Sequence, residues 1–255
     1  MFPFGNERFP FDFTKGYLAV ATYGIIGLGF ALGEIDMEKN YKFLMPLGMI
    51  GALFYLAHTI IGSILWTDYN SITTDISSLT ADGAPNVHLL KIFLLIYGIC
   101  MLLFAIALIK KSFSQYNKLL KTGYIILMIM QLTSMFGYSL FPLSGDKTVM
   151  NFQNMMHIIV TAIVVFTTIS FSFLISFGYL KQEKTKRLGK FTLVMAILIT
   201  LFGLLNPISM WLKLNILGLT ERLEIYAIQL LMFMLSYYYT WVENKCNDNA
   251  VNINK

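Results

Sequence analysis

Seven apolar runs, each close to the length that crosses a membrane as a helix, divide this chain of 255 residues. About 20 apolar residues span the hydrocarbon core of a bilayer, and the backbone polar groups there must bond within the segment. A β-barrel would show short segments of alternating hydrophobicity instead, and the sequence has none. We therefore predict an all-α polytopic transmembrane helical bundle. The predicted spans are residues 17–33, 43–66, 89–109, 123–141, 155–178, 188–205 and 225–242.

Because the first run is short, the number of membrane spans is either seven or six. This run is either a span or an interfacial segment, and in the second case the bundle has six spans. The sixth run can continue towards Trp211 through Pro207, because spans tolerate proline better than soluble helices do. The predicted organisation is one transmembrane domain with short flanking segments: an extracytoplasmic interfacial N-terminus (1–16), the helical domain (17–242) and a disordered cytoplasmic tail (243–255).

Lysine and arginine are concentrated in alternate loops. One side of the predicted bundle carries Lys39, Lys42, Lys110, Lys111, Lys118, Lys121, Lys181, Lys184, Lys186, Arg187, Lys190, Lys245 and Lys255, and the other carries Arg8, Lys15, Lys147, Lys213 and Arg222. Basic loops stay in the cytoplasm, so we expect a plasma-membrane protein with a cytoplasmic C-terminus and an extracytoplasmic N-terminus. The net charge of +5 then reflects topology and anionic lipid. Membrane lipids are the expected partners, nucleic acids are not, and the oligomeric state stays open.

The loop after the second run, residues 67–86, is long for a connection. It has three acidic residues and no lysine or arginine. Within it Ile72, Ile76 and Leu79 recur at helical spacing, which predicts a short amphipathic helix lying on the outer surface. Loops of this length are often functional.

Most ionisable residues outside the basic loops fall in the outer half of the predicted bundle. They are His58, His88, Lys91, Asp146, Lys147, His157, Glu221, Arg222 and Glu224. Polar groups in a membrane are costly, so a site formed by them would open to the outside. Each also has a structural interpretation: the glutamates complement a helix dipole, Lys91 extends to the interface and His58 is a packed core histidine.

Two polar stripes at helical spacing run along the predicted fourth and fifth spans. Gln131, Ser134 and Tyr138 form the first, and His157, Thr161, Thr168 and Ser172 form the second. Such stripes are usually interhelical hydrogen-bonding contacts, and we predict that these two stripes pair with each other.

Two constellations carry possible chemistry. His58, His157 and Asp146 are a candidate zinc site, because three protein ligands and a water make a catalytic centre. His157 and Asp146 are also a candidate acid–base pair, with Ser77 or Ser78 as nucleophile. The sequence has no HxxxH or HExxH motif, no phosphate-binding loop and no dinucleotide fingerprint, so no cofactor is expected and zinc is the alternative.

Three segments in order resemble the bacterial membrane family named domain of unknown function 998. The first reads Tyr69-Asn70-Ser71, Asp75-Ile76-Ser77-Ser78-Leu79 and Gly83-Ala84-Pro85-Asn86. The second is Leu140-Phe141-Pro142 followed by Asp146 and His157, and the third is Gly218-Leu219-Thr220-Glu221-Arg222. The resemblance covers residues 43–242. It implies six spans and a likeness to eukaryotic proteins of lipid control, and it singles out Ser77, Asp146, His157, Glu221 and Arg222.

Three functional hypotheses follow. The first is a lipid-interacting or regulatory protein whose outer pocket binds a headgroup through Arg222, Glu221, Lys91 and His58, with the two basic residues on phosphate. The second is an intramembrane lipid hydrolase or transferase using His157, Asp146 and Ser77. The third is a small-solute transporter, which would need paired interrupted helices with polar groups at the midplane.

Overall fold

The structure is a computed structural model that describes residues 41–145, 149 and 151–243. The predicted first span, the N-terminal segment, Asp146, Lys147 and the tail beyond Glu243 lie outside these residues. Six long α-helices make up most of the described chain: α3 (Leu47–Leu65), α4 (Val87–Gln115), α5 (Lys118–Leu140), α6 (Phe152–Leu180), α7 (Lys186–Trp211) and α8 (Leu217–Tyr237). Shorter elements are η1 (Tyr41–Leu44), η2 (Ile76–Thr80), η3 (Glu183–Thr185) and the π-helical turn η4 (Tyr238–Val242).

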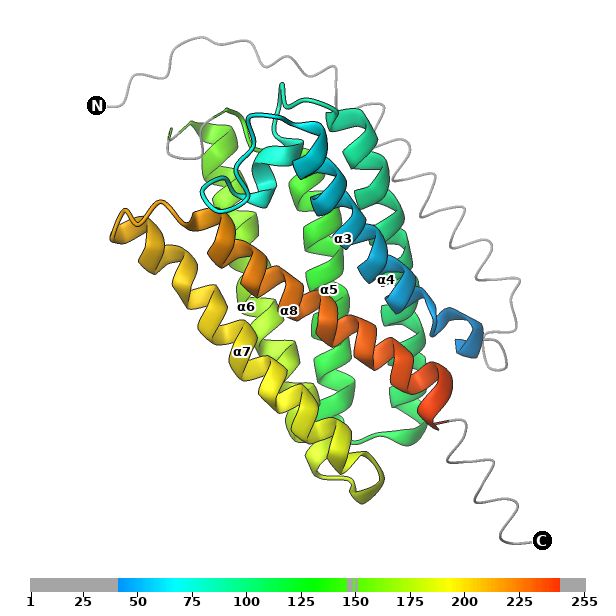
Figure 1. Ribbon diagram of the computed structural model, residues 1–255. Helices are drawn as coiled ribbons and strands as arrows, with labels where there is room; N and C mark the ends of the chain where they lie inside the picture. The colour runs from blue at the N-terminus through cyan, green and yellow to red at the C-terminus, as the bar shows by residue number, and fades with distance from the viewer. Residues whose placement is uncertain (1–40, 146–148, 150, 244–255) are drawn as a thin grey trace, which may run out of the picture. The chain divides into compact units, whose positions relative to one another are not determined.

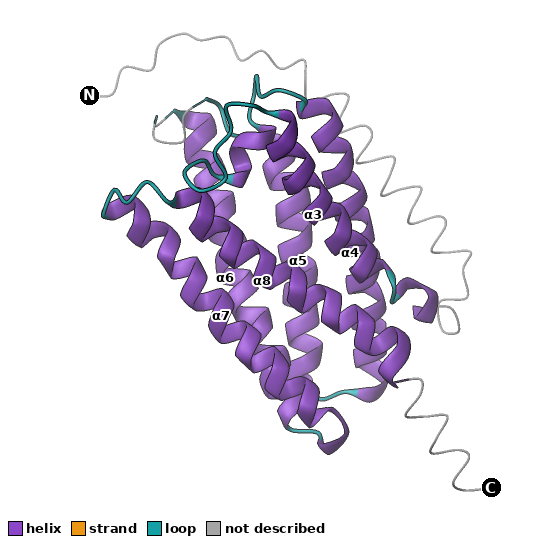
Figure 2. Ribbon diagram, viewed as in Figure 1, coloured by secondary structure: helices purple, strands orange, loops and turns teal. Residues whose placement is uncertain are grey.

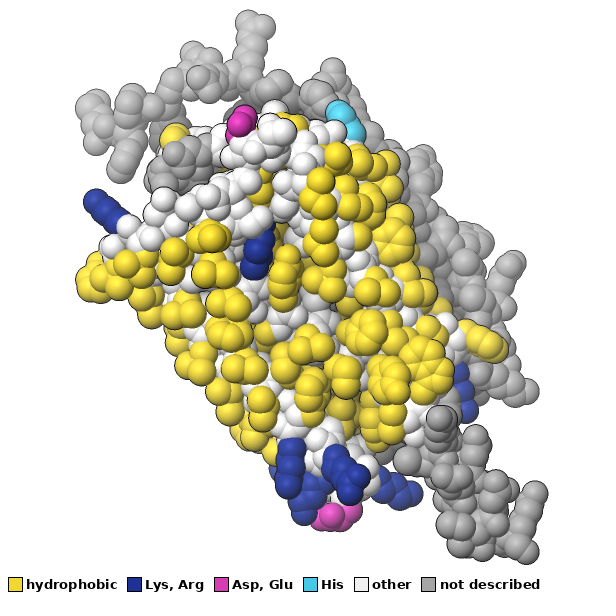
Figure 3. Space-filling view, viewed as in Figure 1, with side chains coloured by type: hydrophobic (Ala, Val, Ile, Leu, Met, Phe, Trp, Pro, Cys, Tyr) yellow, Lys and Arg dark blue, Asp and Glu magenta, His cyan; other side chains and the backbone are white. Residues whose placement is uncertain are grey.

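The six helices form a closed ring. Each packs against its neighbours in sequence, and α8 also packs against α3 (Figure 1). Two long connections, the α3–α4 loop and the segment after α5, lie at the same end of the helices (Figure 2), where Asp82 and Ser144 form a β-bridge. We call this the capped end. The opposite end, where lysine and arginine side chains gather in Figure 3, is the basic end.

All six helices are long and apolar enough to cross a membrane. The prediction of a multi-pass all-helical bundle is confirmed for the described residues, with six spans, whereas the run at 17–33 lies outside them. Helices α5 and α6 begin at asparagine caps. The side chain of Asn117 accepts from the Leu120 amide at 3.2 Å, and that of Asn151 accepts from the Asn154 amide at 2.7 Å, which satisfies amides that a helix start leaves open.

The last two helices differ from the expected limits. Helix α7 continues through Pro207 to Trp211, as the longer alternative predicted. Helix α8 begins at Leu217, eight residues before the predicted start at 225. Hydropathy placed Glu221 and Glu224 outside the span because they are charged, but both belong to the first two turns of the helix, and Glu224 is buried.

The ring is filled by apolar side chains from its centre towards the basic end. Phe104, Leu127, Phe171 and Leu231 come from four different helices and are completely buried in one continuous cluster. Large apolar side chains on the outer faces are exposed instead, and Figure 3 shows them covering the visible flank of the bundle. Apolar surface both inside and outside is what a lipid-facing bundle requires, because its solvent is hydrocarbon.

A buried ion pair closes the basic end. Lys111 Nζ lies 2.6 Å from Glu243 Oε2, and the Tyr116 hydroxyl donates to Glu243 Oε1 at 3.2 Å. Burial, reinforced by the Glu243 charge, raises the pKa of Tyr116 far above its usual range, so this hydroxyl remains a donor. These contacts join the end of α4 to the residue that follows η4.

The predicted surface helix in the α3–α4 loop is not what the structure shows. Only a short 3₁₀ turn, η2, forms there, and its Ile76 and Leu79 are 3% and 0% exposed, whereas Ile72 is 52% exposed and precedes the turn. Ile76 and Leu79 pack inward with Leu90 of α4 rather than lying on the surface. The spacing of Ile72, Ile76 and Leu79 therefore does not reflect an α-helix. Contacts to α8 determine the conformation of this loop.

Candidate functional site

Arg222 holds the α3–α4 loop against the start of α8. Its Nη1 donates to the carbonyl oxygens of Ser71 at 2.7 Å, Thr74 at 3.2 Å and Gly218 at 2.9 Å. Its Nη2 donates to the Tyr69 hydroxyl at 2.6 Å, and the guanidinium lies 5.3 Å from the centre of the Tyr69 ring. The side chain is 8% exposed. The planar fork of arginine thus organises loop carbonyls that would otherwise be buried without donors.

Tyr69 extends this arrangement into the loop itself. Its hydroxyl accepts from Arg222 and shares its one proton between the carbonyl oxygens of Asp75 at 2.8 Å and Thr74 at 3.1 Å. Burial raises the pKa of Tyr69 to about 12, although the nearby Arg222 charge opposes the shift. The hydroxyl is therefore protonated at neutral pH, as its donor role requires.

Glu221 fixes the same loop from the next position on α8. Its Oε2 accepts from the Ile76 amide at 2.5 Å, and its Oε1 accepts from the Ser77 hydroxyl at 3.4 Å. The Leu219 amide donates to the Ile72 carbonyl oxygen at 2.9 Å. The structure thus brings together Ser77, Glu221 and Arg222, three of the sequence-predicted site residues, as parts of one loop-to-helix clasp.

Beneath the clasp, polar side chains from several helices face the ring interior. We call this group the interior polar cluster and define it as Tyr55, His58, Tyr97, Gln131, Tyr138, His157 and Gln229. Tyr55 on α3 stacks edge-on against Tyr97 of α4, with centroids 4.9 Å apart, and against His58 at 5.5 Å. It also lies within electrostatic range of Tyr138 on α5, a helix that is not its neighbour in the ring.

The lower part of the interior polar cluster surrounds the Tyr97 hydroxyl. Gln229 of α8 donates to it through Nε2 at 3.3 Å, and Gln131 of α5 lies beside it. Tyr97 is ten residues into α4, which places it about 15 Å from the capped end of that helix at 1.5 Å per residue. Polar groups from three helices therefore meet near the middle of the bundle.

Several polar atoms of the interior polar cluster are buried without partners in the described structure. They are both ring nitrogens of His58, Nε2 of Gln131 and Oε1 of Gln229. His58 and Gln131 are each 1% exposed, and Gln229 is 3% exposed. Buried polar atoms almost always have a partner, so this concentration marks a place for water or a ligand.

His157 lies on the opposite side of the ring from His58. Its Nδ1 lies 2.8 Å from the Phe141 carbonyl oxygen, and its ring packs against Tyr138 with centroids 5.0 Å apart. The Tyr138 hydroxyl donates to Thr161 Oγ1 at 3.2 Å. The predicted pairing of the two polar stripes is therefore confirmed at Tyr138, whereas Gln131 lies beside Tyr97 of α4 and Ser172 bonds the Ile169 carbonyl oxygen of its own helix.

Glu224 lies at the seam between α7 and α8. Its Oε2 accepts from Asn206 Nδ2 at 2.6 Å, and its side chain passes over Gly203 of α7. The residue is 6% exposed. The charged group that acts on it is Glu221, which has the same sign.

The catalytic arrangement predicted from sequence does not assemble among the described residues. The hydroxyl of Ser77 bonds Glu221 and that of Ser78 bonds Asp75, and neither contacts His157. No three His, Cys, Asp or Glu side chains in the described ranges come together as a metal site. His58 and His157 belong to α3 and α6, which are not neighbours in the ring, and Asp146 lies outside the described residues.

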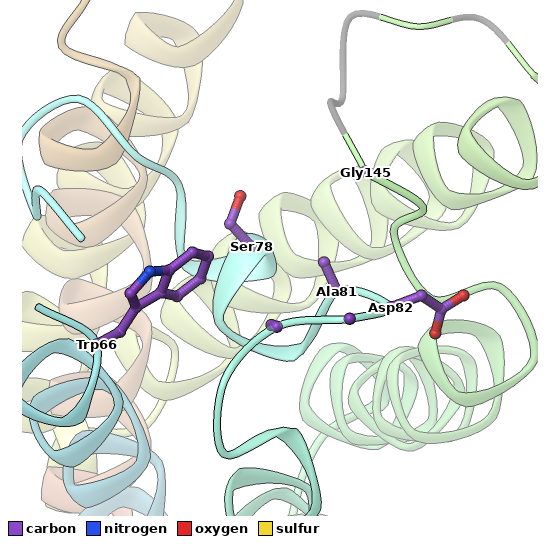
Figure 4. A pocket seen from close by; sticks show the side chains of 7 residues that line it. Trp66, Ser78, Ala81, Asp82 and Gly145 are labelled. Atoms are coloured by element: carbon purple, nitrogen blue, oxygen red, sulfur yellow. The ribbon is translucent and has the colours of Figure 1, made fainter. Parts of the chain in front are cut away.

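A shallow hollow of about 220 Å³ lies on the outside of the capped end. Figure 4 shows it between Trp66, the η2 turn and the loop after α5; it is lined by Trp66, Ser78, Ala81, Asp82, Gly83, Ala84 and Gly145. Its one charged lining residue is the acidic Asp82. Neither Arg222 nor Lys91, the predicted phosphate contacts, lines it.

Sequence reasoning missed Tyr55, Tyr97 and Gln229 as members of the interior polar cluster. Tyrosine and amide side chains in apolar runs are common, and their convergence depends on which helices are neighbours. The detectable signal was the Gln131–Tyr138 stripe, which was interpreted as a packing contact.

Comparison with known proteins gives one match. The model of a family described as "Protein of unknown function (DUF998)" matches residues 49–238, close to the 43–242 expected from the three segments. No curated protein and no solved structure matches the chain.

Proposed function

The chain belongs to the family of proteins of unknown function DUF998, and we propose that it binds a membrane lipid by holding the headgroup in its interior polar cluster. Its capped end would face the outside of the plasma membrane and its basic end the cytoplasm, because basic loops are retained inside. The function is binding or regulation of lipid rather than covalent chemistry.

The observation that carries this proposal is the set of buried polar atoms without partners. The ring is filled by apolar residues towards the basic end, but its other half buries the polar side chains of His58, Gln131 and Gln229. An apolar side chain at these positions would avoid the free-energy cost of burying a polar atom without a partner. Polar groups at membrane depth are expensive and usually functional.

The surroundings favour a lipid over a water-borne solute. The α3–α4 loop is fastened over the capped end by Arg222 and Glu221, which restricts entry from water. The outer faces of the helices are apolar, so a ligand arriving between them comes from the bilayer.

The proposal predicts that lipid retention depends on interior polar atoms. The protein would be purified in mild detergent, and the retained lipid would be measured by native mass spectrometry. Gln131→Leu and His58→Phe remove the unpartnered atoms while keeping side-chain bulk. Each is expected to lower retention about ten-fold, since a lost hydrogen bond to a buried group costs on the order of 1–2 kcal/mol.

The matched control is Ser170→Ala on the outer face of α6, where the hydroxyl only bonds the Phe166 carbonyl oxygen of its own helix at 2.7 Å. Its retention should equal that of the parent protein. If the two interior variants retain as much lipid as this control, or if the parent protein retains none, the headgroup proposal is wrong.

A further inference from the structure

The seam between α7 and α8 buries a carboxyl group within a membrane span. Glu224 is 6% exposed and lies about 10 Å along α8 from the start of the helix at Leu217, at 1.5 Å per residue. Its hydrogen-bond partner is Asn206 of α7, whose Nδ2 donates to Oε2 at 2.6 Å. A carboxylate at this depth is costly unless a positive charge or several donors surround it.

The charged residues next to Glu224 on α8 do not stabilise its ionised form. Arg222 directs its donors to oxygen atoms of the α3–α4 loop and of Gly218. The charge that acts on Glu224 is that of Glu221, one turn earlier on the helix, and it opposes a second negative charge.

The elements packed against α8 add no positive charge at this place in the described structure. The basic residues of α7 lie at its start, within residues 186–190, and Lys213 is exposed beyond its end. Helix α3 has no charged residue, and its titratable side chains Tyr55 and His58 contact each other. The η2 turn follows Asp75, whose carboxylate accepts from a serine hydroxyl of that turn.

Asn206 matches a neutral carboxylic acid better than a carboxylate. Its Oδ1 is a buried acceptor without a hydrogen-bond partner, although its Nδ2 bonds Glu224. A carboxylate can only accept, so it leaves this oxygen unsatisfied. A carboxylic acid has one O–H donor and one acceptor oxygen, the complement of the donor and acceptor of a carboxamide. A proton on Glu224 therefore supplies the donor that the seam lacks.

Helix α7 offers a second acceptor beside the same carboxyl group. Pro207 has no N–H, so the carbonyl oxygen of Gly203, four residues earlier, lacks the amide donor that a regular helix would provide. The carboxyl group of Glu224 packs over this glycine, because a Cβ atom at position 203 would lie 3.0 Å from Oε1. Two acceptors without donors thus adjoin one buried carboxyl group, an arrangement that favours a bound proton.

We propose that Glu224 is a proton-binding site that is occupied at neutral pH, and that loss of the proton loosens the contact between α7 and α8. This inference goes beyond lipid binding and does not depend on it. Ionisation would leave Asn206 Oδ1 without a donor and would place a second negative charge one turn from Glu221. Release of the proton therefore favours separation of the two helices and entry of water, which makes the bundle responsive to pH.

The test is infrared spectroscopy of the purified full-length protein in detergent during a pH titration. A protonated carboxyl group has a C=O stretching band that a carboxylate lacks. Exposed carboxyl groups are ionised at about pH 7, because their ordinary pKa values lie near about 4. The parent protein is expected to retain a protonated-carboxyl band at neutral pH and to lose it as the pH is raised.

Glu224→Gln is expected to remove this band. Its amide also resembles the protonated acid, because it offers one donor and one acceptor to Asn206. The unfolded chain has already released the Glu224 proton at neutral pH, whereas the folded protein retains it, so proton release costs the parent stability as pH rises. The thermal unfolding midpoint of the parent should therefore fall relative to that of Glu224→Gln. Glu183→Gln, which changes an exposed residue at the basic end, should behave as the parent does.

Glu221→Gln is a second variant, in case Glu224→Gln fails to fold. It keeps an acceptor for the Ile76 amide but removes the like charge one turn from Glu224. The protonated-carboxyl band should then disappear at a pH lower by roughly half a unit or more.

A band at neutral pH that Glu224→Gln removes, or that Glu221→Gln moves to lower pH, supports the proton site. A band of equal size in the parent and in Glu224→Gln, or no such band in the parent, overturns it. If the band is present but the unfolding midpoints of the parent and Glu224→Gln change with pH in parallel, the loosening of the α7–α8 contact is wrong. None of these measurements uses bound lipid, so each result is separate from the headgroup proposal.

Discussion

Replacing Gly218 with alanine is expected to lower the free energy of unfolding by about 3 kcal/mol or more, the upper range for overpacked sites. A Cβ atom at this position would collide with the carbonyl oxygen of Thr74 and lie 2.7 Å from that of Ser71. Both oxygens belong to backbone that Arg222 already fixes. The added methyl group therefore cannot be accommodated by rotating a side chain, and the α3–α4 loop must move away from α8.

The control is Gly98→Ala in α4, another helical glycine. There the nearest atom to a new Cβ is the flexible sulfur of Met135 at 3.2 Å, and alanine favours a helix over glycine by about 1 kcal/mol. Thermal unfolding of both variants in the same detergent gives the comparison. A Gly218→Ala protein as stable as Gly98→Ala would mean that the loop is not clasped as described.

The spans were predictable because the bilayer itself imposes their length and apolar character. Residues 43–66 and 155–178 fall on α3 and α6 with small shifts at their ends. The pairing of Tyr138 with Thr161 was predictable too, because polar residues at helical spacing on adjacent spans have few other partners in lipid. The local sequence pattern and the apolar environment of the bilayer were sufficient to predict both features.

The role of Arg222 was not predictable in the same way. A basic residue near the outer end of a span fits a phosphate contact as well as a structural one, and the choice depends on where the α3–α4 loop folds. The partners of Arg222 in this loop are backbone carbonyl oxygens. Every residue has one, so the sequence does not show which of them the arginine will contact. The early start of α8 was missed for a similar reason. Glu221 lies within the helix and its carboxylate accepts from the Ile76 amide, a contact that depends on the conformation of the loop.

Convergence of the interior polar cluster also required the structure. Tyr55 and Tyr97 lie on neighbouring helices, but Gln229 reaches Tyr97 because α8 closes the ring beside α3. Nothing in a single sequence specifies that closure, since six helices can pack in several orders.

Arg222→Lys is expected to lower the free energy of unfolding by about 3 kcal/mol, although it keeps the charge. Lysine has one nitrogen where arginine has a planar fork, so it cannot reach the Ser71 and Gly218 carbonyls and the Tyr69 hydroxyl together. Hydrogen bonds from a charged group contribute roughly 1.5–3 kcal/mol each, and at least one would be lost. A cysteine introduced at Leu79, which is 0% exposed in the parent protein, should then react faster with a water-soluble maleimide in a background without other cysteines.

Arg187→Lys provides the control, because Arg187 is exposed at the basic end and its replacement should change neither stability nor labelling at Leu79. The two interpretations of Arg222 give opposite results. If Arg222→Lys leaves stability and labelling unchanged but reduces lipid retention, then Arg222 contacts the headgroup, as the sequence suggested. If the loop becomes reactive while lipid retention stays unchanged, then the clasp and the binding site are separate, and the arginine serves only to hold the loop in place.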